Sequence, residues 1–214
     1  MVVIYIRHSN DSKRKQVSSI RHRDDLKITP EGLKLARKTG KKLIKMYGEP
    51  SIIYLSPFMR AKETLKEMSK NLKGKPKIKF DNRLSRYFSS SEKKDPSCFT
   101  ETFDHEIPIY ENWDEFKDRV HDNLKSMKKR GYIESKKVIW CITHALPFIQ
   151  ISRVCRIKIP KDIPFMYHFR VRDTRIKYID KFFESKEKKE PSSKSKKKDS
   201  TDLMMVPISN NTKK

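Results

Sequence analysis

The sequence predicts an α/β fold, a three-layer sandwich in which helices flank a mostly parallel central sheet. Three short apolar runs are rich in β-branched and aromatic residues and contain no polar position, as expected of strands buried on both faces. They span residues 2–6, 52–55 and 138–142. Strand patterns alternate with helical patterns along the chain, which is typical of a sheet built from parallel crossover units.

The first helix is predicted after residue 29. Thr29 can cap it, Pro30 suits its first position, and Glu31 lies favourably at the positive end of the helix dipole. Apolar residues then recur at helical spacing, and Gly48 and Pro50 end the pattern.

The remaining elements follow in the same alternating order. A second helix is expected from Arg60 to Leu72, and a further long helix, with Trp113 and Phe116 on its buried side, from about 112 to 129. The other predicted elements are a strand at 77–80, a helix at 146–154, and two late strands at 165–171 and 175–179 that pair antiparallel at one edge of the sheet.

The chain is expected to form one catalytic domain over residues 1–183. Within it, the polar, nonperiodic segment 87–108 is interpreted as an insertion that covers the site as a lid and selects the substrate. Residues 184–214, rich in Lys and Ser and low in hydrophobicity, predict a disordered tail.

Four polar residues follow the three apolar runs closely. They are Arg7, His8, Arg60 and His144. Ligands of open α/β sheets bind beyond the carboxyl ends of the strands, so these residues are expected to converge there. Two arginines and two histidines at one place predict a pocket for a phosphoryl group.

The residue types also suggest the chemistry of this pocket. A nucleophile for phosphoryl transfer must be unprotonated near neutral pH, and an imidazole meets that need. We assign this role to His8. Histidines elsewhere in the chain, such as His121, are expected to be ordinary loop or surface residues. Arg7 and Arg60 would hold the phosphoryl oxygens with fork-shaped donors and His144 would add another donor, so that neither a metal ion nor another cofactor is required.

The motifs around these residues resemble the histidine phosphatase superfamily, in its phosphoglycerate mutase-like branch. The resemblance spans roughly residues 1–180 and includes Arg7-His8, residues 26–32 before the first helix, the segment from Ser56-Pro57 to Thr64, and Thr143-His144. It implies a phosphoglycerate mutase-like fold and a phosphohistidine intermediate that water hydrolyses. The resemblance therefore favours a metal-independent phosphatase acting on a phosphomonoester, a phosphoanhydride or a phosphoprotein bond.

The sequence departs from the pattern of this family next to both histidines. Ser9 replaces a usual glycine, and Ala145 stands where glycine is frequent. With Asn10 they are candidate substrate-binding residues.

A second departure concerns the proton donor. Arg86 occupies the position at which many members carry a proton-donating glutamate. A replacement could come from the carboxylates of the insertion, which are Glu92, Asp95, Glu101, Asp104 and Glu106. Without such an acid, we expect aryl phosphates, phosphoanhydrides and phosphoproteins to be hydrolysed faster than alkyl phosphates.

Two other functions use the same residues. A cofactor-dependent mutase would return the phosphoryl group to a substrate hydroxyl, and Arg86 together with Ser9-Asn10 argues against it. A catalytically weak phosphate-binding module would capture a phosphorylated molecule without turnover, and the presence of His8 argues against that. The expected partner is therefore a phosphorylated small molecule or a phosphoprotein.

The chain is strongly basic, with a net charge of +24. Such a surface attracts polyanions, but the lysines are not interleaved with aromatic residues, so nucleic acid is a second interpretation and not the favoured one. The lysine run at 194–198 could direct the protein to the nucleus. No apolar stretch is long enough to span a membrane, and three cysteines without metal-ligand spacing suggest reduced thiols in the cytoplasm. The sequence sets no expectation for the oligomeric state.

Overall fold

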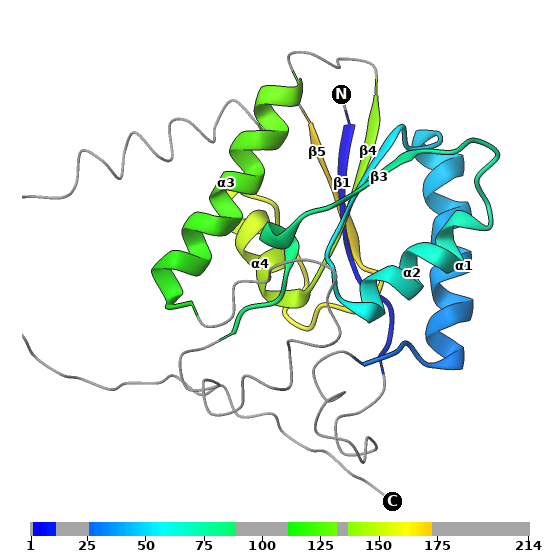
Figure 1. Cartoon of the computed structure of the whole chain (residues 1–214), viewed down its shortest axis with the longest axis horizontal. Helices are drawn as coiled ribbons and strands as arrows, with labels where there is room; N and C mark the ends of the chain where they lie inside the picture. Colours follow the sequence, from blue (N-terminus) through cyan, green and yellow to red (C-terminus); the bar gives the residue numbers. More distant parts are fainter. Residues whose placement is uncertain (1, 12–25, 89–110, 132–136, 173–214) are drawn as a thin grey trace, which may run out of the picture.

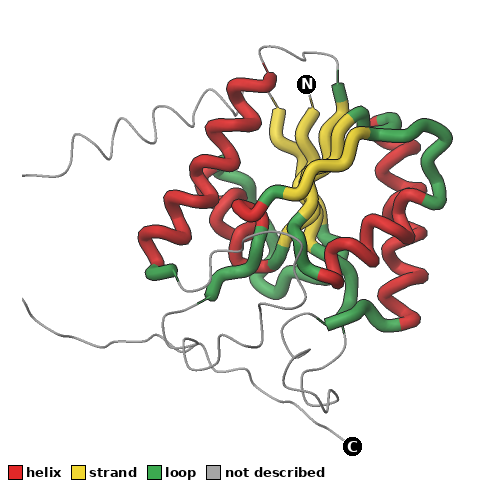
Figure 2. The backbone as a smooth tube through the Cα atoms, in the orientation of Figure 1, coloured by secondary structure: helices red, strands yellow, loops and turns green. Residues whose placement is uncertain are grey.

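The computed structural model of the chain describes residues 2–11, 26–88, 111–131 and 137–172. Figure 1 shows a central sheet with helices α1 and α2 on one side and α3 and α4 on the other. The tube in Figure 2 shows the same three layers by type of structure. The predicted three-layer α/β fold is therefore confirmed.

The described residues form a five-stranded sheet in the order β3-β2-β4-β1-β5. The first four strands in this order run parallel, while β5 pairs antiparallel with β1 at one edge. The strands are β1 (Val2–Arg7), β2 (Ile52–Leu55), β3 (Lys77–Phe80), β4 (Val138–Thr143) and β5 (His168–Arg172). The strand predicted at 77–80 is confirmed. The edge strand begins at residue 168, three residues later than the predicted strand at 165–171, and ends at 172. The second late strand, predicted at 175–179, lies outside the described residues.

Each face of the sheet has its own hydrophobic core. On one face, α1 (Pro30–Tyr47) and α2 (Met59–Ser69) bury residues such as Leu43 and Met68 against the strands. On the other face, α3 (Trp113–Gly131) and α4 (Ala145–Val154) bury Phe116 and Phe148. The central strands contribute alternate residues to the two cores, which explains why the apolar runs that form them contain no polar position.

Local signals set the first helix. The Thr29 hydroxyl accepts a hydrogen bond from the Gly32 amide at 3.0 Å, and Pro30 occupies the first helical position. Gly48 follows the last helical residue with a φ of 84°, in the left-handed region that glycine tolerates. The predicted beginning and end of this helix are confirmed.

Two predictions about α3 are wrong. Trp113, expected in the core, is 42% exposed because it is the first helical residue, at the border of the cluster where its ring contacts Tyr87 and Phe116. His121, expected on a loop or at the surface, is buried between α3 and α4, with its ring 3.4 Å from the Gln150 amide.

Several predictions concern residues that the structure describes only in part. Of the insertion expected at 87–108, only 87 and 88 are described, and the tail at 184–214 lies outside. The domain boundaries therefore stay predictions. Cys141 and Cys155 are buried, and neither forms a disulfide among the described residues. Within the described ranges, no helix has both the length and the apolar character needed to cross a membrane.

Candidate functional site

The carboxyl ends of three neighbouring strands lie together. Arg7 at the end of β1 is in register with Thr143 at the end of β4, and the His8 amide continues the ladder by donating to the Thr143 carbonyl at 2.9 Å. On the other side of β4, the Ser56 amide donates to the Ile142 carbonyl at 3.1 Å. Residues that directly follow these strands therefore face a common site, as the parallel sheet requires.

His8 is held in one orientation and one tautomer. Its Nδ1 lies 2.7 Å from the Ser9 carbonyl oxygen, which can only accept, so Nδ1 carries the proton. The neutral ring then has its lone pair on Nε2. Burial, followed by the nearby Arg60 charge, lowers the pKa of His8 well below its ordinary value, so the ring is neutral at pH 7.

The second histidine lies against the first. The ring centroids of His8 and His144 are 5.0 Å apart, and His144 is the N-cap residue of α4. Arg60 donates from Nε to His144 Nδ1 at 3.1 Å, which leaves the His144 proton on Nε2, directed at the Ser56 hydroxyl 2.8 Å away. Burial and the Arg60 charge lower the pKa of His144 well below its ordinary value.

Arg7 borders the same site. Its guanidinium lies 4.2 Å from the centroid of the Phe165 ring, and that ring is 5.7 Å from the His8 ring. Its Nη1 donates to the Ile163 carbonyl, while its buried Nε has no hydrogen-bond partner among the described residues. Partial burial lowers the pKa of Arg7, but the group remains charged at neutral pH. The four residues predicted to converge are thus brought together.

The candidate substrate-binding residues have anchoring contacts. Ser9 donates from its amide to the Thr64 hydroxyl at 2.9 Å and from its own hydroxyl to the Gly32 carbonyl at 2.7 Å. The Asn10 carbonyl accepts from the Thr29 amide at 2.9 Å. These bonds fix the backbone after His8 against α1 and α2. Ala145 is half-buried at the start of α4, directly after His144.

The structure adds Asp11 to the site, a residue that the sequence analysis did not select. Its Oδ2 is 3.7 Å from Arg60 Nε, and its side chain is 22% exposed. Burial raises the pKa of Asp11 above the usual carboxyl value, although Arg60 opposes the shift. Its position three residues after His8 was the available sequence signal. Ser56 was also detectable, because it follows a strand as His8 and His144 do.

On the α3 side, an ion pair fixes the loop that carries Arg86. Arg119 donates from Nε to Glu111 Oε2 at 2.7 Å, and its Nη2 is paired with Glu111 Oε1. The same guanidinium donates to four carbonyls of the loop, those of Asn82, Arg83, Ser85 and Arg86. Arg86 itself stacks on Phe88, with its guanidinium carbon 3.9 Å from the ring centroid. These contacts fix the loop in place. The charges of Arg86 and Arg119 lie near enough to lower the pKa of His144 further.

Fold and site together define an α/β protein whose two histidines and two arginines gather at the carboxyl edge of a mostly parallel sheet. The family profile of the histidine phosphatase superfamily, branch 1, matches residues 3–180. The chain therefore belongs to this superfamily, most of whose members are phosphatases. The suspected resemblance is confirmed. No curated protein matched the chain.

Solved structures share this fold. The protein histidine phosphatase SixA in complex with tungstate is 16% identical, with a TM-score of 0.56, covering 82% of this chain and 91% of SixA. The ecdysone phosphate phosphatase of Bombix mori, also with tungstate, is 15% identical, with a TM-score of 0.59 and coverage of 80% and 88%.

A phosphoglycerate mutase from Bacillus anthracis is 13% identical, with a TM-score of 0.58, covering 85% of this chain and 96% of the mutase. At these identities the likeness concerns the fold alone.

Proposed function

We propose that the protein is a phosphatase that forms a phosphohistidine on His8. The observation that carries the proposal is the hydrogen bond from His8 Nδ1 to the Ser9 carbonyl, which leaves the lone pair on Nε2 in a neutral ring. A buried structural histidine has no need of two arginines beside it, and their charges disfavour its protonation. The same charges favour a phosphoryl dianion.

The first step is attack of His8 Nε2 on phosphorus as the bond to the leaving oxygen breaks. Arg7 and Arg60 bind the equatorial oxygens, and the His144 proton that now points at Ser56 can be offered to a phosphoryl oxygen directly or through the Ser56 hydroxyl. In the second step, water attacks phosphorus and His8 leaves as the neutral ring. Tungstate, bound by two phosphatases of similar fold, is the expected inhibitor because it imitates phosphate.

Asp11 is our candidate for the proton donor that Arg86 cannot be. Of the carboxylates that the structure describes, it is the one paired with a pocket arginine. A bound phosphoryl dianion would raise the pKa of Asp11 further, which favours the protonated form that a general acid needs. It would give this proton to the leaving oxygen and recover one from the attacking water.

The substrate class follows from the same chemistry. Arg60 favours the ionised Asp11 carboxylate, which reduces the fraction of Asp11 that carries a proton to donate, so we expect aryl phosphates, phosphoanhydrides and phosphoproteins to react faster than alkyl phosphates. The phosphoglycerate mutase of similar fold makes a mutase the second candidate function, and Arg86 together with Ser9-Asn10 argues against it.

Steady-state release of phosphate tests the proposal. We expect His8→Asn to lower kcat on p-nitrophenyl phosphate by about 10³-fold or more, because the nucleophile is gone. The matched control is His168→Asn, a half-buried histidine of β5, which should stay within about twofold of wild type. Tungstate binding without turnover in the wild type would instead identify a phosphate-binding module.

A further inference from the structure

The positive charge is unevenly distributed over the two helical layers. Helices α1 and α3 have nearly the same length, 18 and 19 residues. Each carries six Lys and Arg, but α1 has one acidic residue and α3 has four. A lysine-rich composition alone would not remove the acids from one of the two helices. Exposed residues of α1 are mainly cationic, which makes its outer face a strongly positive surface.

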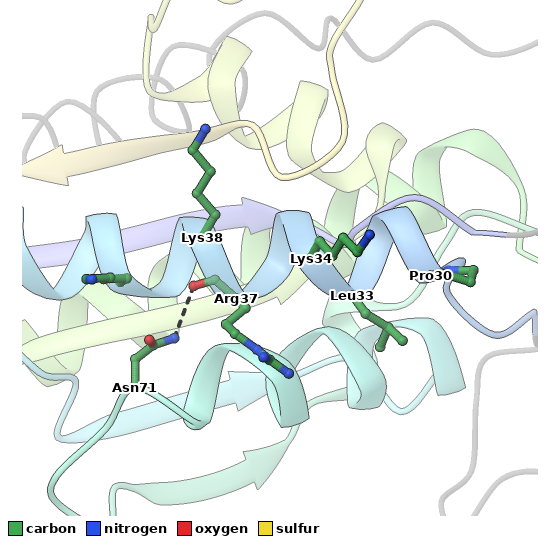
Figure 3. A pocket seen from close by; sticks show the side chains of 7 residues that line it. Pro30, Leu33, Lys34, Arg37, Lys38 and Asn71 are labelled. Carbon is green, nitrogen blue, oxygen red and sulfur yellow. Dashed lines mark hydrogen bonds between the residues drawn. The ribbon is translucent and has the colours of Figure 1, made fainter.

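This face contains a groove of about 710 Å³ between α1 and the end of α2. Its lining residues are Pro30, Leu33, Lys34, Arg37, Lys38, Lys41 and Asn71. In Figure 3, Leu33 and Arg37 lie on the side of α1 that faces α2, and Lys38 extends from the opposite side. The Asn71 side chain donates to the Arg37 carbonyl at 3.0 Å and so closes one end.

The cations of the groove differ in how far they are already neutralised. Arg37 forms an ion pair with Glu67 at 2.8 Å. Within the described part of the chain, Lys34, Lys38 and Lys41 have no carboxylate partner. All three are exposed, so their charges are available to a ligand.

The groove begins beside the candidate site. Gly32, in the first turn of α1, accepts the hydrogen bond from the Ser9 hydroxyl, and Pro30 is two residues away. From Pro30 to Lys41 the helix advances about 16 Å, which is the length of about five extended residues. A chain of that length could lie along α1 while a phosphorylated residue next to it reaches His8.

The lining favours an acidic peptide over a nucleic acid. Among the residues that the structure describes, no aromatic side chain lines the groove, whereas single-stranded nucleic acids are held by stacking on aromatic rings. Pro30 and Leu33 form an apolar part that suits one aliphatic side chain among carboxylates. Basic walls with an apolar contact complement a segment of Asp and Glu around a leucine-like residue.

We propose that this groove is a docking site for an acidic segment of a phosphoprotein substrate. That the bound segment belongs to a substrate rests on the proposed phosphatase function. Binding of the segment to the groove requires no turnover. It predicts that affinity for the segment comes from α1, and that small phosphate esters, which do not reach the groove, are hydrolysed independently of it.

The test compares two charge reversals of equal size. The groove variant is Lys34→Glu/Lys38→Glu, and the control is Lys125→Glu/Lys129→Glu, the same i,i+4 spacing on exposed positions of α3. Fluorescence anisotropy measures binding of a short labelled Asp/Glu peptide with one central Leu, of its Asn/Gln counterpart, and of an oligouridylate. The phosphorylated acidic peptide and p-nitrophenyl phosphate measure turnover.

We expect the groove variant to weaken binding of the acidic peptide about tenfold or more, with the control within about threefold of wild type. KM for the phosphopeptide should rise in parallel, and kcat on p-nitrophenyl phosphate should not change. Equal losses in both variants, or tighter binding of the oligouridylate through the same lysines, would overturn the proposal. If the peptide binds but nothing is hydrolysed, the phosphatase function fails and the docking site stands.

Discussion

The two helical layers support the candidate site in different ways. The α1–α2 layer keeps most of its charges outside, with Arg60 and Glu67 as buried exceptions, and holds the backbone after His8 through short neutral bonds from Ser9 to Thr64 and Gly32. The α3–α4 layer places charge inside and fixes the loop before Phe88 through the Arg119–Glu111 pair. The α1–α2 side of the site therefore depends on close packing, whereas the α3–α4 side depends on a buried ion pair. Substitutions on the two sides should lower the free energy of unfolding through different causes.

The largest expected effect comes from breaking that buried pair. Arg119 and Glu111 have side chains that are 10% and 6% exposed, so Arg119→Met leaves a buried carboxylate and four carbonyls without their donor. We expect a loss of about 3–5 kcal/mol in the free energy of unfolding, measured with urea. The control on the other layer is Arg37→Met. The Arg37 side chain is 57% exposed, so this substitution should cost at most about 1 kcal/mol. Similar losses in the two variants would contradict the comparison.

Close packing of the α1 layer is tested by two glycines. A Cβ at Gly32 would lie 2.4 Å from the Asn10 carbonyl oxygen, and one at Gly40 would lie 2.9 Å from the Met68 backbone. We expect Gly32→Ala and Gly40→Ala each to cost about 1–3 kcal/mol in urea denaturation. Only Gly32→Ala should also lower kcat, because it displaces the segment after His8. An unchanged kcat in Gly32→Ala would show that this segment does not set the site.

A substitution of Asp11, which pairs with Arg60 of α2, tests the proposed role of this carboxyl in proton transfer. Asp11→Asn keeps the shape but removes the acid, so we expect hydrolysis of an alkyl phosphate to fall about tenfold or more. Hydrolysis of an aryl phosphate should stay within about threefold. Asp118→Asn, an exposed carboxylate of α3, is the control. Equal effects of Asp11→Asn on both substrates would assign Asp11 to binding instead.

The smallest expected effect is a dependence of the free energy of unfolding on pH. It comes from His8, which follows β1, and His144, which follows the adjacent strand β4. Burial lowers the pKa of both His8 and His144 below their unfolded value. The unfolded chain therefore takes up protons first, and the free energy of unfolding should fall as pH drops below about 6.5. His8→Asn should make this decline shallower. Asp11, whose pKa is raised, acts in the opposite sense at lower pH, so the measurement is confined to about pH 5.5–7.5.

The sequence predicted elements whose cause is local. Apolar runs marked the buried strands, and Thr29 with Pro30 marked the start of α1, because capping depends on neighbours within a turn. The rule that ligands bind at the carboxyl ends of parallel strands then located His8 and His144 correctly.

The features that could not be predicted from the sequence depend on contacts between segments that are far apart in the chain. Arg119 binds carbonyls 33 to 37 positions before it, and no periodicity reveals such a contact. Trp113 fits the apolar stripe of α3, but the position of the helix relative to the cluster leaves it exposed. The pairing of Asp11 with Arg60 likewise depends on how α2 is placed against β1.

The most direct test of the account is to locate the phosphoryl group during turnover. The protein is mixed rapidly with an aryl phosphate and quenched in alkaline detergent, in which a phosphohistidine survives, and its peptides are mapped by mass spectrometry. The account predicts one added phosphoryl group on His8, absent from His8→Asn and retained in His168→Asn. Turnover with the label on another residue, or with no phosphoenzyme at any time point, would contradict it.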